Sequence, residues 1–238
     1  RFGKFYLNSS TGAYLYVPDE SLIEALKADE REAFSVRVSD GSANTTQSLN
    51  IAITAGNDTP VLGAVTAISL TDTAVNNSFA DVTGNLTAID RDGDAVQFGV
   101  AGQVAGTQVI GATVYNAKKA GTYGTLYLNV DSGAYRYVVD DAAIEALKTD
   151  ASEVFSLLAS DGSASAAGLL TVNITAENDT PSLSASVTTI ELTDTASEDR
   201  FASSTSVLTS SDRDAPDTAL YGITGGSSDS SRSGYDLK

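Results

Sequence analysis

The stretch LNVDSGAYRYVVDDAAIEALKTDASEVFSLLASDGSA at residues 128–164 decides the fold, because the chain carries it twice. The other copy, LNSSTGAYLYVPDESLIEALKADEREAFSVRVSDGSA, occupies residues 7–43. Further outward, residues 1–60 align without a gap to 122–181, and residues 61–101 align to 182–224 with two single-residue slips. A fixed period indicates a tandem array, and a period of roughly 121–123 residues is the length of one ordinary domain.

The repeat predicts one complete domain between two partial ones. We expect the back half of a repeat at residues 1–57, a complete repeat at 58–178 and the front half of the next repeat at 179–238. The two halves together spell nearly one whole repeat, in the register of the intact copy. We therefore hypothesise that the front half of one molecule folds with the back half of another, which would bring Lys238 of one chain near Arg1 of the next.

Segments rich in β-branched and aromatic residues alternate with clusters of Gly, Asp, Asn and Ser, which predicts short strands joined by turns. The strands expected in the complete repeat are 65–71, 83–89, 95–101, 107–115, 123–129, 133–139, 153–160 and 167–175. One segment, DDAAIEALKTDASE at 140–153, has apolar residues at helical spacing behind the candidate capping residue Asp140 and predicts a two-turn helix. The predicted fold class is all-β, with tandem immunoglobulin- or cadherin-like β-sandwiches and one short crossover helix per repeat.

Composition excludes several classes of function. The net charge is −17, which argues against a nucleic-acid partner and favours cation binding. The chain has no Cys, so it forms no disulfide and no thiolate metal site. No apolar run approaches the length of a membrane span, so direct membrane insertion is not expected. Neither His nor a thiol nucleophile is present, and similar carboxylates recur in each repeat, so we do not expect an enzyme.

The carboxylates gather in turns, and the predicted topology brings these turns together at the two ends of the complete repeat. The last two strands form a hairpin, so its turn lies opposite the outgoing linker, beside the incoming linker and the turn after the second strand. Asp, Asn and Gly are good turn formers, which explains each cluster singly but not their shared location. The candidate ligands of the first junction are Asn57, Asp58, Asp90, Asp92, Asp94 and Asp161, and those of the second are Asp72, Glu177, Asn178, Asp179, Asp212 and Asp214.

Like charges at this density repel, and a hard cation with oxygen ligands relieves the repulsion. Calcium takes six to eight oxygens, whereas magnesium demands a stricter octahedral geometry that suits a junction between two domains less well. The DRDGD sequence at 90–94 departs from the EF-hand loop, which we exclude. In the third copy Ala215 and Pro216 replace Gly93 and Asp94, so Asp217 is expected to substitute less well.

The sequence GTYGTLYLNVDSGAYRYVVDDAAIEALKTDASEVFSLLASDG at 121–162, with VNITAENDTP at 172–181, resembles the VCBS repeat. This repeat is a cadherin-like module of large surface adhesins of Gram-negative bacteria, including RTX- and Bap-like repeat proteins. The resemblance implies interdomain calcium in the linkers and turns, an extracellular location at the bacterial cell surface, and neighbouring repeats of the same protein as partners. One departure is RFGKFYLN at the start of the first copy, which keeps Gly3 but not the preceding Gly-Thr.

Three functions follow as hypotheses. The first is a calcium-stiffened spacer that holds an adhesive tip away from the cell and supports adhesion and biofilm formation. The second is a self-assembling component of a biofilm matrix, surface layer or fibre, with half-domains completed between chains. The third, a carbohydrate-binding module, is disfavoured because the chain has no Trp. Isopeptide crosslinks through Lys27 or Lys148 would need a buried lysine, and both are expected to face solvent.

Overall fold

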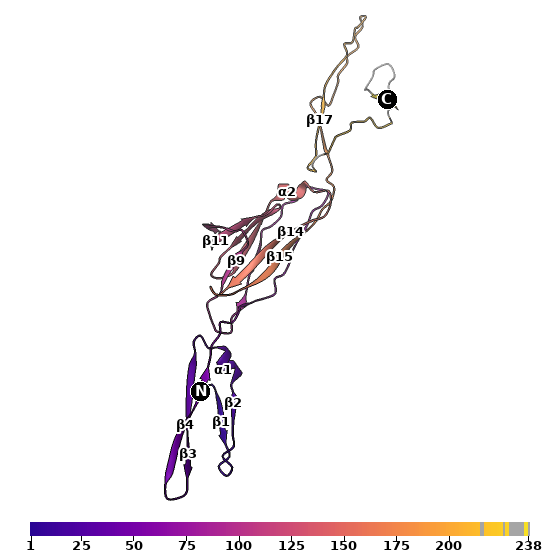
Figure 1. Ribbon diagram of the computed structural model, residues 1–238. Helices are drawn as coiled ribbons and strands as arrows, with labels where there is room; N and C mark the ends of the chain where they lie inside the picture. Colours follow the sequence, from indigo (N-terminus) through magenta and orange to yellow (C-terminus); the bar gives the residue numbers. More distant parts are fainter. Residues whose placement is uncertain (215–216, 226, 229–235, 238) are drawn as a thin grey trace. The chain divides into compact units, whose positions relative to one another are not determined.

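The computed structural model describes residues 1–214, 217–225, 227–228 and 236–237 (Figure 1). Two sequence predictions, the substitution at Ala215 and Pro216 and the placement of Lys238, lie outside the described residues. The chain divides into two compact units. Unit 1 holds Arg1–Ile68, Ala80–Val139 and Glu153–Val172, and unit 2 holds Ser69–Phe79, Asp140–Ser152 and Asn173–Lys238. The repeat boundaries near residues 57 and 178 stay a prediction.

Two sheets dominate the complete repeat. The first has the strand order β10-β11-β12-β13-β7, and the second has the order β6-β15-β14-β9. In Figure 1, β9, β14 and β15 run alongside one another, and β11 belongs to the other sheet. The first sheet consists of β10 (Val104–Ile110), β11 (Thr113–Ala120), β12 (Gly124–Leu128), β13 (Ala134–Val139) and β7 (Val82–Asn85), and the second of β6 (Ile68–Thr71), β15 (Ser165–Thr175), β14 (Ala151–Ser160) and β9 (Gln97–Val100).

The core of unit 1 lies between these sheets, because each contributes a row of alternating apolar side chains. Leu126 and Tyr137 of the first sheet are fully buried, as are Leu157 and Leu170 of the second. The ring of Tyr137 meets Phe155 of β14 edge-on, with centroids 5.9 Å apart. The prediction of an all-β sandwich is therefore confirmed.

Several boundaries differ from the sequence prediction. The strand predicted at 107–115 is wrong, because Gly111 adopts φ +63° and turns the chain between β10 and β11, which pair with each other. The segment predicted at 83–89 divides into β7 and β8 (Ala88–Ile89), and β8 pairs with the unpredicted β5 (Val61–Leu62). Helix α2 (Asp141–Glu145) is shorter than the predicted two turns, although Asp140 caps it as expected by accepting from Ala143 N at 3.2 Å.

The turn between β12 and β13 packs against Leu86, which follows β7. The Oδ1 atom of Asn129 accepts from the two backbone N–H groups of Asp131 and Ser132, which closes the turn. Gly133 then adopts φ +76°, and a Cβ at this position would lie 2.5 Å from the carbonyl oxygen of Leu86. Only glycine permits both the positive φ and the close approach.

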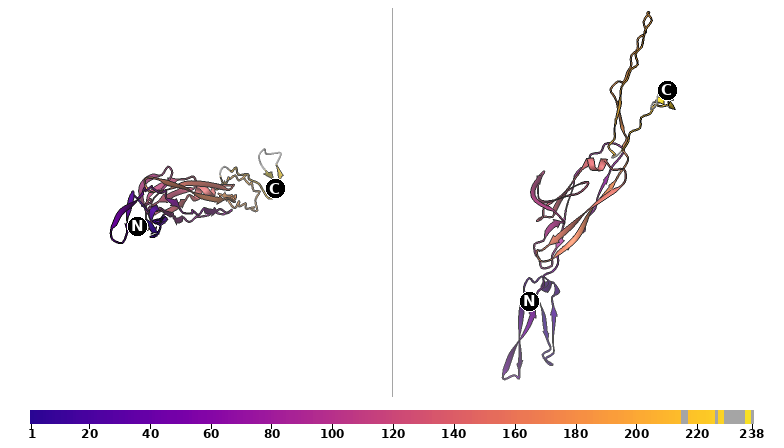
Figure 2. Two further views of the ribbon diagram at one scale, coloured as in Figure 1. Left: turned by 60° about the horizontal axis from the view of Figure 1, so that its bottom comes forward. Right: turned by 45° about the horizontal axis from the view of Figure 1, so that its top comes forward.

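Residues 1–53 of unit 1 repeat the later half of the sandwich as two hairpins, drawn in indigo and violet in Figure 2. Phe5 stacks on Phe34 with centroids 5.0 Å apart, so the two hairpins pack together. The Tyr16 hydroxyl donates to Glu32 Oε1 at 2.6 Å, and Tyr137 donates to Glu153 in the equivalent contact. The elements are β1 (Gly3–Leu7), β2 (Tyr14–Pro18), α1 (Glu20–Glu24), β3 (Glu30–Ser39) and β4 (Asn44–Ile53).

Unit 2 contains α2 and the strands of the third copy. Strand β16 (Ser182–Ala185) pairs with β17 (Leu208–Ser211), and β18 (Ser227–Ser228) pairs with β19 (Asp236–Leu237). The loop after β6 lies against α2, since Asn77 N donates to Glu145 Oε1 at 2.9 Å and Phe79 N donates to Asp141 Oδ1 at 3.2 Å. Among the described residues, no helix is long and apolar enough to span a membrane.

Candidate metal centres

The first junction is built around Asp92. Asp90, Asp92 and Asp94 each offer a carboxylate oxygen, and these three oxygens lie within 4.8 Å of one another. Asp92 is buried, and its Oδ2 accepts from the linker N–H of Asp58 at 2.6 Å. Asp92 Oδ1 and Asp90 Oδ2 are buried without a hydrogen-bond partner. A buried carboxylate oxygen without a donor is costly, and a cation would satisfy it.

The linker and the β14–β15 turn meet at the same junction. The side-chain amide of Asn57 donates to Asp161 Oδ2 at 3.0 Å and to Asp58 O at 2.9 Å. The Ala164 N–H, the Asn57 amide and the Ser163 N–H hold the pKa of Asp161 below its usual range. Desolvation, with the nearby charges of Glu24 and Asp92, raises the pKa of Asp58.

Basic side chains neutralise part of the negative charge at this junction. Lys27 forms an ion pair with Asp94 and also donates to Gly93 O at 3.3 Å. Arg91 Nη1 lies 3.3 Å from Glu24 Oε2, and both of these side chains are exposed. A cavity of about 190 Å³ opens beside the carboxylates and is lined by Lys27, Ala28, Asp29, Ala55, Gly56, Asn57, Asp92 and Asp94. The junction therefore has both ligands and room for an ion.

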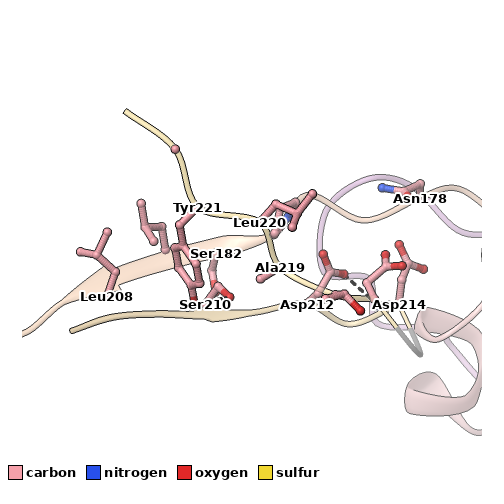
Figure 3. Close-up of a pocket in the computed structure, with 14 residues that line it drawn as sticks. Asn178, Ser182, Leu208, Ser210, Asp212, Asp214, Ala219, Leu220 and Tyr221 are labelled. Carbon is pink, nitrogen blue, oxygen red and sulfur yellow. Dashed lines mark hydrogen bonds between the residues drawn. The ribbon is translucent and has the colours of Figure 1, made fainter. Parts of the chain in front are cut away.

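The second junction repeats this frame around Asp214. Asp212, Asp214 and Asp217 offer carboxylate oxygens within 4.8 Å of one another. Asp179 N donates to Asp214 Oδ2 at 2.6 Å, the same contact and distance as in the first junction, and Asp214 Oδ1 is buried without a hydrogen-bond partner. Figure 3 shows Asp212 and Asp214 at one end of a cavity of about 590 Å³, with Asn178 nearby.

Three more carboxylates are buried at the second junction, on Asp72, Asp179 and Glu145. Arg213 binds two of them, with Nη2 2.6 Å from Asp179 Oδ1 and Nε 2.8 Å from Glu145 Oε2. Desolvation raises the pKa of Glu145, and the charges of Asp72 and Asp179 raise it further, against the lowering effect of the N–H donated by Asn77.

The sequence did not point to Glu145 and Arg213 as parts of this site, and the ligand role of Glu177 stays a prediction. The Glu177 side chain is exposed, and its contribution is a backbone N–H donated to Asp72 Oδ2 at 3.4 Å. A signal for Glu145 was present, because the helix sequence IEALK places Glu24 at the equivalent position of the first copy. The lysines that follow these helices are exposed, as predicted, and Lys148 pairs with Asp217 as Lys27 pairs with Asp94.

The donor set of both junctions suits calcium. All the donors are oxygens of carboxylates, side-chain amides or backbone, which hard cations prefer. The unpaired buried oxygens of Asp92 and Asp214 mark where such an ion would find ligands. The absence of His and Cys from the sequence leaves zinc and the softer transition metals without their usual ligands.

No family model matches the sequence, and no curated protein does. Among solved structures, the chain is similar to protocadherin gamma B7 extracellular cadherin domains 1–4, at 14% identity and a TM-score of 0.39 over 90% of this chain and 49% of that one. It is also similar to Drosophila N-cadherin EC1-3, at 16% identity and a TM-score of 0.28 over 65% of this chain and 45% of that one. The chain thus spans about half the length of these cadherin fragments, and the fold assignment rests on the strand order described above.

Proposed function

We propose that this chain is part of a calcium-stiffened extender array of a large bacterial surface adhesin. In this role the repeats act as an extracellular spacer that supports cell adhesion and biofilm formation, and each junction binds calcium. The observation that carries the proposal is the pair of buried, unpartnered carboxylate oxygens, Asp92 Oδ1 and Asp214 Oδ1, at equivalent positions of successive repeats. A structural metal site recurs with the repeat, whereas an active site has no reason to do so.

Calcium would link the linker to the turn beside it. In each junction the linker already donates an N–H to the turn carboxylate, so the two segments are held in place before an ion binds. An ion that takes oxygens from both segments fixes their relative orientation. The VCBS-like motifs and the acidic, cysteine-free composition support a surface array that uses calcium in place of disulfides.

Calorimetry and scattering test this proposal together. We expect calcium to bind the 238-residue chain with a Kd on the order of 10⁻⁴ to 10⁻³ M, as in other extracellular modules. Binding to the native state should raise the melting temperature, and small-angle scattering should show a more extended, less variable particle in calcium than in chelator. The double variant Asp92→Asn with Asp214→Asn should lose both effects.

Asp40→Asn is the matched control. Asp40 lies in the same SDGS turn sequence as Asp161, but it accepts only the N–H groups of its own turn, from Ser42 and Ala43. This variant should bind calcium as the wild type does. An absence of calcium heat and of any thermal shift at millimolar calcium would defeat the proposal.

A further inference from the structure

The outward face of the sheet that contains β9, β14 and β15 carries no charged side chain within unit 1. These three strands lie side by side (Figure 1). Alternate residues of β14, such as Phe155 and Leu157, are buried in the core, so the residues between them point to solvent. The outward residues of 97–100, 154–160 and 165–171 are all Gln, Gly, Ser, Thr, Ala, Val or Leu. We refer to them as the outer face of the complete repeat.

Three aliphatic side chains are exposed on the outer face. Leu169 of β15 is 60% exposed, and Val154 and Leu158 of β14 are 52% and 38% exposed. The solvent-facing side of an antiparallel sheet is commonly polar, so these residues depart from the usual pattern. Neighbouring apolar side chains that stay exposed on a soluble domain mark an interaction surface.

The register of the β14–β15 hairpin makes these side chains neighbours. Its turn closes with the same backbone hydrogen bond as the β3–β4 turn of the first copy, so the two hairpins share one register. In the first copy Ser35 pairs with Ser48. The equivalent pair in the complete repeat is Ser156 with Leu169. Leu169 thus lies diagonal to both aliphatic side chains that β14 places on the outer face, within side-chain reach of each.

The first copy has a different surface at the same positions. Arg37 stands where the complete repeat has Leu158, and Ser48 stands where it has Leu169. The inward row of the same strand, in contrast, is apolar in both copies. The hairpin therefore forms with or without aliphatic residues on its outward side, and their presence in the complete repeat calls for a role other than folding.

We propose that the outer face of the complete repeat packs against the same face of a second copy of this chain. Two chains that each carry a net charge of −17 repel where their acidic surfaces meet, and an uncharged face lets them touch without that repulsion. A basic partner would find its complementary charge at the acidic junctions instead. The contact is isologous, with two sheets stacked about 10 Å apart.

The size of the outer face determines how strong this contact is. Three strands about 4.8 Å apart and about seven residues long present roughly 350 Å² per partner. This area is well below that of a specific, stable interface, so one pair of repeats associates weakly. Arrays that carry several such repeats would gain by multivalency, and the contact would then bundle extenders side by side. This consequence rests on the proposed extender role, whereas the contact itself does not.

A chemical crosslink tests the contact, because the natural chain has no Cys. Leu169→Cys in the full chain should link to a second copy through a bis-maleimide whose spacer is about 10 Å, the spacing of packed sheets. Ser48→Cys is the matched control, since it places a thiol at the equivalent exposed position of the first copy. The Leu169→Cys dimer should form in clear excess over the Ser48→Cys dimer. Equal yields would overturn the proposal.

Sedimentation equilibrium of Leu158→Arg tests the same face energetically. The wild-type chain should form a weak dimer as its concentration rises, and the variant should weaken it by about tenfold or more, because the contact would bury an unpaired cation. The variant should fold, since Arg37 occupies the equivalent position of the first copy, and circular dichroism checks this.

Val109→Arg is the control for Leu158→Arg. It makes the same change at a side chain that is 59% exposed on β10 of the other sheet, and it should leave the dimer unchanged. Equal losses in the two variants would contradict the proposed face. A wild-type chain that stays monomeric at every concentration would overturn the contact.

Salt and chelator separate this inference from the calcium proposal. A contact between uncharged faces should tighten as salt screens the repulsion between two acidic chains, and it should persist in chelator. A dimer that salt weakens would show that ion pairs hold the chains together, which would overturn the proposal. A dimer that forms only in calcium would assign the association to the junctions and would also overturn it, whatever calorimetry shows for the metal.

Discussion

The two acidic junctions share one backbone frame but differ in how their carboxylates are neutralised. In both, a linker N–H donates to the central carboxylate at 2.6 Å, and an Asn amide donates to the next carbonyl at 2.8–2.9 Å. At the second junction Arg213 holds two buried carboxylates, whereas its counterpart Arg91 makes one exposed pair. Arg213 should therefore contribute more to stability than Arg91, because the carboxylates that it pairs with are buried.

Glu145 is buried because another segment of the chain covers it. The loop of residues 72–79 lies against α2 and shields Glu145, while the counterpart Glu24 on α1 is exposed. Arg213 then serves as an internal cation for the second junction, and at the proposed calcium site it would compete with the ion for Asp179. The comparison leads us to expect that the second junction is the more ordered one without calcium, and that its arginine reduces its affinity for the ion.

Arg213→Ala should cause the largest loss of folding stability when calcium is removed by a chelator. Arg213 is partly exposed, but its removal leaves uncompensated charges on the buried carboxylates of Asp179 and Glu145, which should give the largest loss of stability among these variants. Urea unfolding of the full chain in chelator measures the loss, and millimolar calcium should restore most of it. Arg91→Ala is the matched variant and should cost no more than about 1 kcal/mol, because that pair is exposed. Equal losses in the two variants would remove the distinction between the junctions.

Calcium titration of the same variants sharpens the comparison. If Arg213 competes with the ion, Arg213→Ala should bind calcium more tightly at one site, by about tenfold if competition is worth 1.4 kcal/mol. Calorimetry resolves this change against the unchanged site of Arg91→Ala. Tighter binding together with lower stability in chelator would identify Arg213 as a competitor, and weaker binding would identify it as a support for the ligands.

A third prediction concerns the carboxylates. Asp92→Ala and Asp179→Ala should each weaken calcium binding at their own junction and leave the sandwich folded, because both residues lie outside the strands. Circular dichroism checks the fold and calorimetry the binding. Leu128→Ala is the contrasting core variant, expected to cost about 2–5 kcal/mol through the cavity it leaves. Loss of folding in all three variants would show that junction and core are one unit.

The pH dependence in chelator gives a smaller effect. The native pKa of Glu145 lies above its ordinary value of 4.5, so the folded state binds a proton more tightly than the unfolded state. Stability from this group should therefore rise as the pH falls from neutral through the native pKa, and level off below the ordinary value. Urea unfolding of wild type and Glu145→Gln across this range isolates the contribution. Parallel pH profiles for the two proteins would contradict it.

The smallest expected effect distinguishes two copies of one turn. Asp161 and Asp40 accept similar N–H groups of their own turns, but Asp161 also accepts the Asn57 amide. Asp161→Asn should therefore cost slightly more stability than Asp40→Asn, because it loses one more hydrogen bond. Thermal unfolding in chelator measures the difference. A larger loss in Asp40→Asn would show that the linker contact is not stabilising.

Much of the structure could be predicted from the sequence because the sequence contains an internal repeat. The all-β class, the capped helix and the grouping of carboxylates in turns follow from local patterns, since apolar alternation and turn residues act over a few positions. The internal alignment also identified residues that serve equivalent roles, such as Asp92 and Asp214. The extra turn at Gly111 escaped prediction because an apolar run of this length does not show where one strand ends.

Only the tertiary structure decided which acidic residues are buried and what neutralises them. Glu145 and Glu24 occupy the same place in the same helix sequence, yet one is shielded by residues 72–79 and paired with Arg213 while the other is exposed. Glu177 follows the linker pattern and still points to solvent. The physical reason is that desolvation and pairing depend on segments distant in sequence, and these act on a side chain only after the chain has packed.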